Sequence, residues 1–330
     1  MAITGTVPLS YMQAAIEAVA GTDLAATRKQ PILGGTLTEH YERTKIMEQR
    51  GSLIRNYRSI QTKRWCEISG MEVAPTFQDL GWFMRLAAQG KASSSGTPTA
   101  VTAFRYDFQP TVATDDLKTA TLEVGDTTQE WDVNFAVINR LEFGWSVGGV
   151  ATLSCDWLGQ KATASSYTSN LSDRVTEDIN GALAKVYIDS TTIGSTQVYN
   201  VLDYRFVLDN HYAQFWAADG GIFSRDVYRT EPRSAQVEAT LAFIDTTEYL
   251  TFTGDTSRKM RTRVLGSAIA GASGGQTQQL DIDWYGKWDE APFGEQDGLH
   301  VVKFSGESHY DATAGADWKV SVITDVSTLA

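Results

Sequence analysis

Hydrophobic and polar positions alternate with period two along most of the chain from residue 100 onward. Successive side chains of a β-strand point to opposite faces, so this alternation is typical of strands that are buried on one face. The 9 Trp, 13 Tyr and 13 Phe also favour strands. The pattern predicts strands that include Phe104–Phe108, Leu122–Val124, Trp131–Val137, Ala184–Ile188, Leu202–Leu208, Val237–Phe243, Leu280–Trp284 and Trp318–Val322.

The clearest predicted pair of strands is Ile138–Val147 followed by Val150–Leu158. Each alternates apolar and polar residues, and the connection between them is Gly148-Gly149. Glycine tolerates the positive φ that tight hairpin turns need. The sequence therefore predicts a β-hairpin with a two-residue turn.

One helix is predicted in the segment PTFQDLGWFMRLAAQG, which begins at Pro75. Phe77, Leu80, Met84 and Ala87 recur at helical spacing, and Gly90 follows the last of them. Proline near the start of a helix and glycine just past its end match the usual asymmetry of helix termini. We expect an all-β fold, a sandwich or barrel, in which this short helix covers one face of a sheet.

Three polar stretches divide the chain. Lys91–Ala100 and Gly266–Gln278 are predicted to be flexible loops, and Lys161–Asp173 is the best candidate for a boundary between two β units. The predicted division is residues 1–64 as an N-terminal arm and long loop, residues 65–165 as a first β domain and residues 166–330 as a second. A short echo supports tandem duplication, because INRLEFGWSV with VATLSCDWLG resembles VLDYRFVLDN with VEATLAFIDT. Strand patterning alone can also produce such an echo, so both explanations stay open.

Charge is distributed unevenly along the chain. Nine basic and three acidic residues give 28–64 a charge of +6, whereas the whole chain carries −12, which leaves −18 for the remainder. An acidic body argues against tight binding of nucleic acid, since affinity for phosphate comes largely from Lys and Arg. The basic arm is either a docking element for an acidic neighbour or a solvated loop.

Size and composition fit an ordinary folded protein. The 330 residues suffice for one large β domain or two smaller ones. The start of the chain lacks the pattern of a signal peptide, and no apolar run reaches the roughly 20 residues of a membrane-spanning helix. We therefore expect a protein folded in a cytoplasm without a membrane partner. Cys66 and Cys155 are too few for a disulfide framework or a zinc site and are expected to be reduced thiols.

A G-x-S-x-G match centred on Ser146 is the pattern of a hydrolase nucleophile elbow. That chemistry needs a sharp turn from a strand into a helix, whereas Ser146 is predicted to lie on a strand that continues into another strand. No histidine has an evident partnering position for it. We expect no catalytic residue at this match.

The other candidates for chemistry are weak. The histidines His40, His211, His300 and His309 are scattered, and the Gly-rich segment at 271–275 lacks the Lys-Ser/Thr ending of a phosphate-binding loop. Asp281 and Asp283 are expected to lie on a solvated strand face, with a metal-binding pair as the less favoured alternative. We thus expect no cofactor and no metal. Stacking of sugars on exposed tryptophans remains an alternative, with Trp82, Trp216, Trp284 and Trp288 as candidates and Trp145 and Trp157 expected in the core.

The order of several motifs resembles the tail tube (major tail) proteins of long-tailed, non-contractile phages. These motifs are MEVAPTFQDLGWFMRLAAQG, FRYDFQP, KTATLEVGD and WDVNFAVINRLEFGWSVGGVATLSCDWLGQK, then ALAKVYID, VLDYRFVLDN and the closing run from LDIDWYG to DWKVSVIT. The resemblance spans about residues 65–325, and the first 60 or so residues match only loosely.

The resemblance implies a structural subunit whose sheets join edge to edge into rings that stack into a channel for genome ejection. It implies a virion protein, assembled in the host cytoplasm, whose partners are further copies of itself and tail proteins such as the tape measure, tail tip and terminator. Double-stranded DNA would pass through an acidic lumen without specific binding. Three copies per ring follow if the halves are duplicated units, and six if they are not. A carbohydrate-binding β-sandwich is the alternative.

Overall fold

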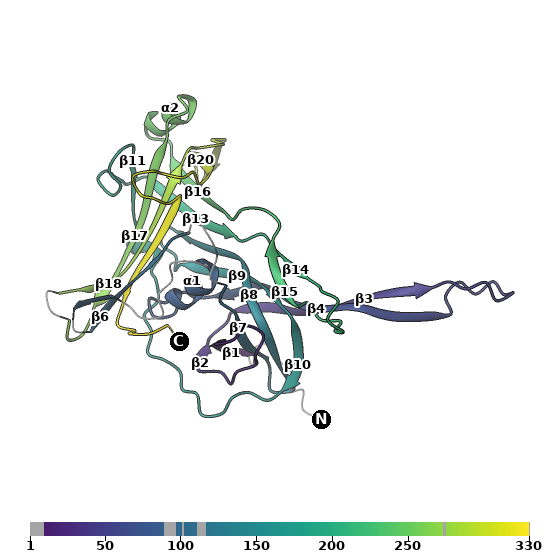
Figure 1. Ribbon diagram of the computed structural model, residues 1–330. Coiled ribbons are helices and arrows are strands. Elements are labelled where there is room, and N and C mark those ends of the chain that lie inside the picture. Colours follow the sequence, from purple (N-terminus) through teal and green to yellow (C-terminus); the bar gives the residue numbers. More distant parts are fainter. Residues whose placement is uncertain (1–9, 89–96, 101, 111–116, 273–274, 330) are drawn as a thin grey trace.

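The computed structural model describes residues 10–88, 97–100, 102–110, 117–272 and 275–329. The described residues form mainly antiparallel sheets with two short α-helices (Figure 1). This arrangement confirms the predicted all-β class.

A ladder of eight antiparallel strands forms the centre of the molecule; we call it the eight-strand ladder. Its neighbouring strands pair antiparallel throughout. In spatial order the strands are β3 (Gly34–Ile46), β4 (Arg58–Val73), β9 (Thr152–Gly159), the second half of β8 (Glu130–Ser146), β13 (Val201–Asp209), β16 (Ser234–Ala242), β20 (Leu299–Glu307) and β19 (Phe293–Gln296).

Two five-strand ladders accompany it. The first consists of β2 (Arg28–Gln30), β1 (Tyr11–Ile16), β7 (Ala120–Gly125), the first half of β8 and β10 (Lys161–Ser165). The second consists of β12 (Gln197–Val198), β11 (Lys185–Asp189), β17 (Arg258–Ala268), β18 (Thr277–Gly286) and β21 (Trp318–Thr324). Beyond β21, β6 (Ala103–Phe108) and β5 (Thr97–Ala100) extend this five-strand ladder to a seven-stranded sheet. The hairpin β14 (Tyr212–Phe215) and β15 (Asp226–Arg229) is inserted between β13 and β16.

The same strand arrangement occurs twice along the chain. In residues 11–165, which we call unit 1, β1 pairs with β2 and β7, β4 lies between β3 and β9, and helix α1 follows β4. In residues 185–324, which we call unit 2, β11 pairs with β12 and β17, β16 lies between β13 and β20, and helix α2 (Thr247–Thr253) follows β16. The long β8 of unit 1 corresponds to β18 and β19 together. Its two halves meet near Phe135, whose φ of 53° is unusual for a bulky residue.

Helix α1 (Leu80–Ala88) confirms the predicted packing helix. All its residues except Arg85 are buried, and it contacts β8, β6 and β21. It therefore packs between the ladders of both units. The helix is shorter than the segment from Pro75, because Thr76 and Asp79 form a turn in which the Asp79 N–H donates to Thr76 Oγ1 at 3.1 Å. Helix α2 was not predicted, and none of its residues is buried.

The predicted hairpin of β8 and β9 is confirmed, with Leu141 opposite Cys155 and Phe143 opposite Leu153. The two-residue turn is wrong, because the last pair is Gly144 with Thr152. Ser146 instead pairs with β13 at Asp203. On the other strand, Val150 pairs with Asn180 and the Ala151 N–H donates to the Ile179 carbonyl at 2.9 Å, so the connection between β8 and β9 is wider than predicted.

Several segments predicted as loops contain strands. Within Lys91–Ala100, residues 91–96 lie outside the described residues and Thr97–Ala100 is β5. The loop predicted at Gly266–Gln278 is narrower, because β17 runs to Ala268 and β18 begins at Thr277, with 273–274 outside the described residues. The stretch from Lys161 begins as β10.

The N-terminal 64 residues also contain β1, β2, β3 and the start of β4, where an arm and long loop was expected. Position 65 therefore lies inside β4, whereas position 165 is the end of β10. The division into residues 1–64, 65–165 and 166–330 stays a prediction. The sequence echo matches β8–β9 with β13–β16, and this match is wrong. The topology relates β13–β16 to β3–β4 and relates β8–β9 to β19–β20.

Candidate assembly surfaces

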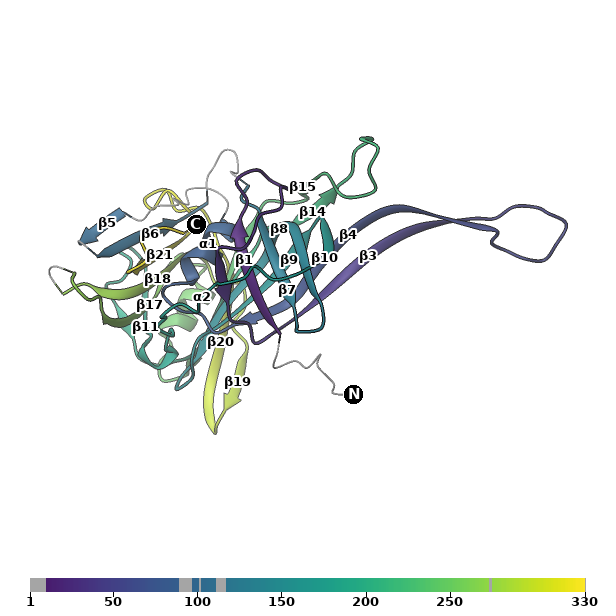
Figure 2. The same cartoon turned by 90° about the horizontal axis from the view of Figure 1, so that it is seen from below.

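The hairpin of β3 and β4 projects far from the rest of the molecule (Figure 1 and Figure 2). Its base belongs to the eight-strand ladder, where β4 pairs with β9 from Cys66 to Val73. We call residues 39–65 the arm. Charged pairs brace it across the two strands, with Arg64 Nη2 2.8 Å from Glu39 Oε2 and Lys63 Nζ 3.0 Å from Glu42 Oε2. Most of the basic residues of the 28–64 segment therefore lie on this arm.

Large apolar side chains are exposed toward the far end of the arm. They are Met47, Leu53, Ile54 and Ile60. An exposed apolar group on a protruding element, surrounded by charges, is typical of an interaction site. The arm is therefore a candidate surface for contact with another molecule.

One face of the eight-strand ladder carries an excess of carboxylates. Arg205 lies between two of them, with its guanidinium nitrogens 2.5 Å from both Glu142 carboxylate oxygens and 3.1 Å from Glu238 Oε1. The ladder register places eight acidic and three basic side chains on this face, and none of them is buried. The acidic residues are Glu67, Glu72, Glu142, Asp156, Asp203, Asp209, Glu238 and Glu307, and the basic ones are Arg140, Arg205 and Lys303.

The two ends of the eight-strand ladder are β3 and β19, and neither pairs with a strand on its outer side among the residues that the structure describes. Beside β3 there is a groove of about 630 Å³ between the eight-strand ladder and the first five-strand ladder. Its apolar lining includes Leu37, Ile68, Met71, Val124 and Trp131. This open edge of unit 1 is a second candidate surface.

At the other end, an aromatic cluster surrounds β19. The ring of Phe293 lies 5.2 Å from that of Phe243 and 5.0 Å from that of Tyr249 on α2. Phe293 and Phe243 are both exposed. Their exposure on an unpaired edge makes this cluster a third candidate surface.

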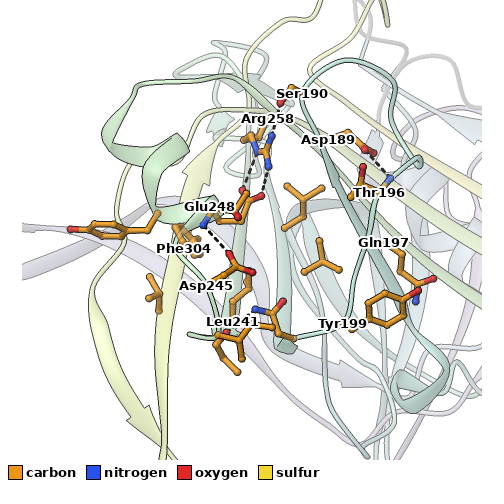
Figure 3. Close-up of a pocket in the computed structure, with 18 of the residues that line it drawn as sticks. Asp189, Ser190, Thr196, Gln197, Tyr199, Leu241, Asp245, Glu248, Arg258 and Phe304 are labelled. Carbon is orange, nitrogen blue, oxygen red and sulfur yellow. Dashed lines mark hydrogen bonds and ion pairs between the residues drawn. The ribbon is translucent and has the colours of Figure 1, made fainter.

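A groove of about 600 Å³ adjoins the cluster and is shown in Figure 3. Its charged groups are already paired: Arg258 forms an ion pair with Glu248, and Asp189 accepts hydrogen bonds from the backbone of Ser195 at 3.0 Å and Thr196 at 2.8 Å. These groups stabilise the walls of the groove. Because these charged groups are paired within the chain, the aromatic rim is the part of the groove suited to contact with a partner.

Asp281 and Asp283 correct the expectation of a solvated face. Each is buried and forms a bidentate ion pair on β17, Asp281 with Arg263 at 2.7 Å and Asp283 with Arg261 at 2.6 Å. Burial raises the pKa of Asp283, and the carboxylate of Asp283 raises the pKa of Arg261. These pairs cross-link two strands of the second five-strand ladder.

Ser146 does not lie on a nucleophile elbow. It is exposed at the end of β8, opposite Asp203, and the chain continues through a turn to β9 and not into a helix. Of the histidines, His40 on β3 lies 3.2 Å from Glu67, and His211, between β13 and β14, lies 3.4 Å from Asp209. Cys66 and Cys155 are free and buried, and burial raises the pKa of both thiols.

The tryptophans proposed for sugar stacking lie mostly in the core. Trp82, Trp284 and Trp288 are buried, as are Trp145 and Trp157, which were expected there. Trp216 is half-buried, with Trp65 at its edge and the Lys63 ammonium 4.8 Å from its ring centroid. Three of the four candidates are therefore not accessible to a carbohydrate.

Among the described residues there is no group of three or more His, Cys, Asp or Glu side chains placed to hold a metal ion. Within the same part of the chain, no helix is both long and apolar enough to cross a membrane.

The fold and these surfaces define a class of protein: a β-rich subunit with unpaired sheet edges and a projecting hairpin, features of proteins that associate with further copies of themselves. A family model described as phage tail tube protein matches residues 9–307, and the chain belongs to this family. It is therefore a structural component of the phage tail, as the resemblance implied. No curated protein matches the chain.

The residues of these edges were not singled out from the sequence. A signal for β19 was present, because Asp297-Gly298 lies between two strands and both residues have positive φ, 51° and 78°, as in a tight hairpin turn. Leu37 carried no comparable signal.

Proposed function

We propose that the chain is the repeating subunit of a tail tube, in which copies join edge to edge into a closed ring and rings stack into the channel for genome ejection. The role is structural and not catalytic. The observation that carries the proposal is the eight-strand ladder with an unpaired strand at each end. Unpaired edges promote association, and a closed ring removes them by giving every edge a partner.

Three copies per ring is the stoichiometry that the topology favours. Units 1 and 2 repeat the same strand arrangement and lie side by side in one ladder, joined by β8 and β13. Three chains would thus supply six similar units around the ring. The alternative of six chains would place twelve units in it.

The carboxylate-rich face of the ladder suits the lumen of such a tube. Its excess of acidic over basic side chains repels the phosphates of double-stranded DNA, so that the duplex passes without being held. In this proposal, the charged pairs around Arg205 keep the face rigid, and the net charge of the face stays negative.

The arm suits contact between stacked rings. It extends beyond the ladder and exposes apolar residues that a neighbouring ring would cover. The tape measure, tail tip and terminator proteins are the further partners expected for a tube assembled in the host cytoplasm.

Negative-stain electron microscopy of the purified chain, alone and with tail initiator proteins, tests this function. We expect uniform rings or long tubes, and a ring mass of three chains of 36.2 kDa each. A stable monomer at high concentration under both conditions would contradict the proposal, and a ring of six chains would contradict the stoichiometry.

A further inference from the structure

The β8–β13 junction joins unit 1 to unit 2 inside one chain and provides a template for the contact between chains. Building on the proposed ring, we infer that β19 of one copy pairs with β3 of the next copy in the register of this internal junction. The partner is a second copy of this chain, bound head to tail.

The end of β8 corresponds to β19 residue by residue. Phe143 lies opposite Leu153 on β9, and Phe293 lies opposite Val302 on β20. Leu153 in turn lies opposite Val73 on β4, and Val302 lies opposite Leu241 on β16. Val73 and Leu241 precede helices α1 and α2 by seven and six residues. Phe143 and Phe293 therefore occupy the same place in the two units, and each is followed by a glycine, Gly144 or Gly294.

The start of β13 corresponds to the start of β3. Phe206 lies opposite Val237, which is four residues before Leu241. Leu37 lies opposite Ile68, which is five residues before Val73. A β-bulge between Ile68 and Met71 accounts for the extra residue. Leu37 is thus the counterpart of Phe206, and Thr36 is the counterpart of Arg205.

These correspondences fix the register between copies. In the internal junction Phe143 lies opposite Phe206 and Gly144 lies opposite Arg205. Transferred to the ring, Phe293 lies opposite Leu37 of the next copy and Gly294 lies opposite Thr36 of the next copy.

The exposed surfaces at the two ends match this arrangement. Phe143, with Phe206 of β13 opposite it, is 1% exposed, whereas Phe293, on the last strand, is 56% exposed. The groove beside β3 is apolar where the phenylalanine would enter, with Leu37, Ile68 and Trp131 in its lining. Each end of the eight-strand ladder therefore lacks the neighbour that the other end supplies in the next copy.

Disulfide cross-linking tests this register. A chain with Thr36→Cys is mixed with a chain with Gly294→Cys, assembled and oxidised. Opposite residues in an antiparallel pair have Cα atoms about 4.5–5.5 Å apart, within the range of a disulfide. A Cβ at Gly294 meets only the Val301 side chain, at 3.6 Å, so the substitution is tolerated. We expect a covalent dimer on a non-reducing gel from the mixture and none from either chain alone.

The matched control pairs Thr44→Cys with Gly294→Cys. Thr44 lies on the arm, eight residues from Thr36, or about 26 Å along an extended strand, and no cross-link is expected. The buried Cys66 and Cys155 are shared by all samples and report any background. Rings or tubes that form without the Thr36–Gly294 cross-link would overturn the register while the proposed function stands. Failure of the unsubstituted chain to assemble under any condition would overturn both.

Discussion

Phe143 and Phe293 occupy equivalent positions in the two repeated units, yet only one is covered. Phe206 of β13 lies opposite Phe143, whereas the ring of Phe293 lies beside Phe243 and Tyr249 of its own unit. The difference in exposure follows from position in the ladder: β8 has a strand on both sides, and β19 is the last strand. An apolar residue left at an edge in this way identifies where the next copy binds.

The substitution Phe293→Glu should abolish ring formation and leave the subunit folded. Burying a carboxylate in the apolar groove beside β3 costs several kcal/mol, more than a marginal interface can offset. The free subunit loses little, because the side chain is more than half exposed. Sedimentation velocity should show a monomer where the unsubstituted chain assembles, with the midpoint of thermal unfolding within a few degrees.

Val175→Glu is the matched control, because Val175 is also exposed and lies on the segment between the units. It should assemble normally. Rings formed by the Phe293→Glu chain would show that β19 is not at the interface.

The all-β class and the hairpin of β8 and β9 could be predicted from the sequence. Alternation of apolar and polar residues shows directly which strands have one buried face. Leu141, Phe143 and Trp145 are buried on one side of β8, while Glu142 faces the other. The same reasoning wrongly placed Asp281 and Asp283 on a solvated face. Alternation distinguishes apolar from polar positions, but it cannot show that Arg261 and Arg263 on β17 cover the polar side.

The duplication was harder to predict, because it is a property of pairing and not of residue pattern. The echo matched β8–β9 with β13–β16, strands that are neighbours in the ladder but not equivalents. The equivalent strands β3 and β13 have almost no identical residues at corresponding positions. Leu37 on the open edge, for example, corresponds to Phe206 in the core. An edge strand and a central strand experience different environments, so their sequences diverge even where the topology repeats.

Shortening the arm should separate ring formation from stacking. Ile46 and Arg58 are paired, so residues 47–57 can be replaced by Asn-Gly, which closes a two-residue hairpin. This removes the exposed Met47, Leu53 and Ile54 but leaves the base of the arm in the ladder. We expect single rings and no tubes in electron micrographs. Tubes of normal length would show that this part of the arm does not hold rings together.

Adding positive charge to the carboxylate-rich face should make the tube retain DNA. Ser154→Lys with Asp156→Lys places two ammonium groups per chain on β9, on the same face as Glu142. Short labelled duplex DNA should bind to these tubes at about 50 mM salt and be released at about 200 mM, because binding to phosphate depends on counterion release. Asp226→Lys on β15, away from the ladder, is the control and should not retain DNA. Equal retention by both would show that this face does not line the channel.

Glu130 should make the subunit less stable at alkaline than at acidic pH. The side chain lies on the first half of β8 and is 3% exposed, and burial together with Asp132 raises its pKa to about 8 from about 4.5. Between these values the folded state holds a proton that the unfolded state has lost, so the free energy of unfolding falls as pH rises through this range and then levels off. Glu130→Gln keeps the shape and removes the charge. The difference in free energy of unfolding between pH 5 and pH 9, from urea titrations, should shrink by about 1–3 kcal/mol. Glu231→Gln removes the same charge from an exposed loop and should leave that difference as it is in the unsubstituted chain. An unchanged difference in the Glu130→Gln chain would show that this carboxyl group is ionised in the folded subunit at neutral pH.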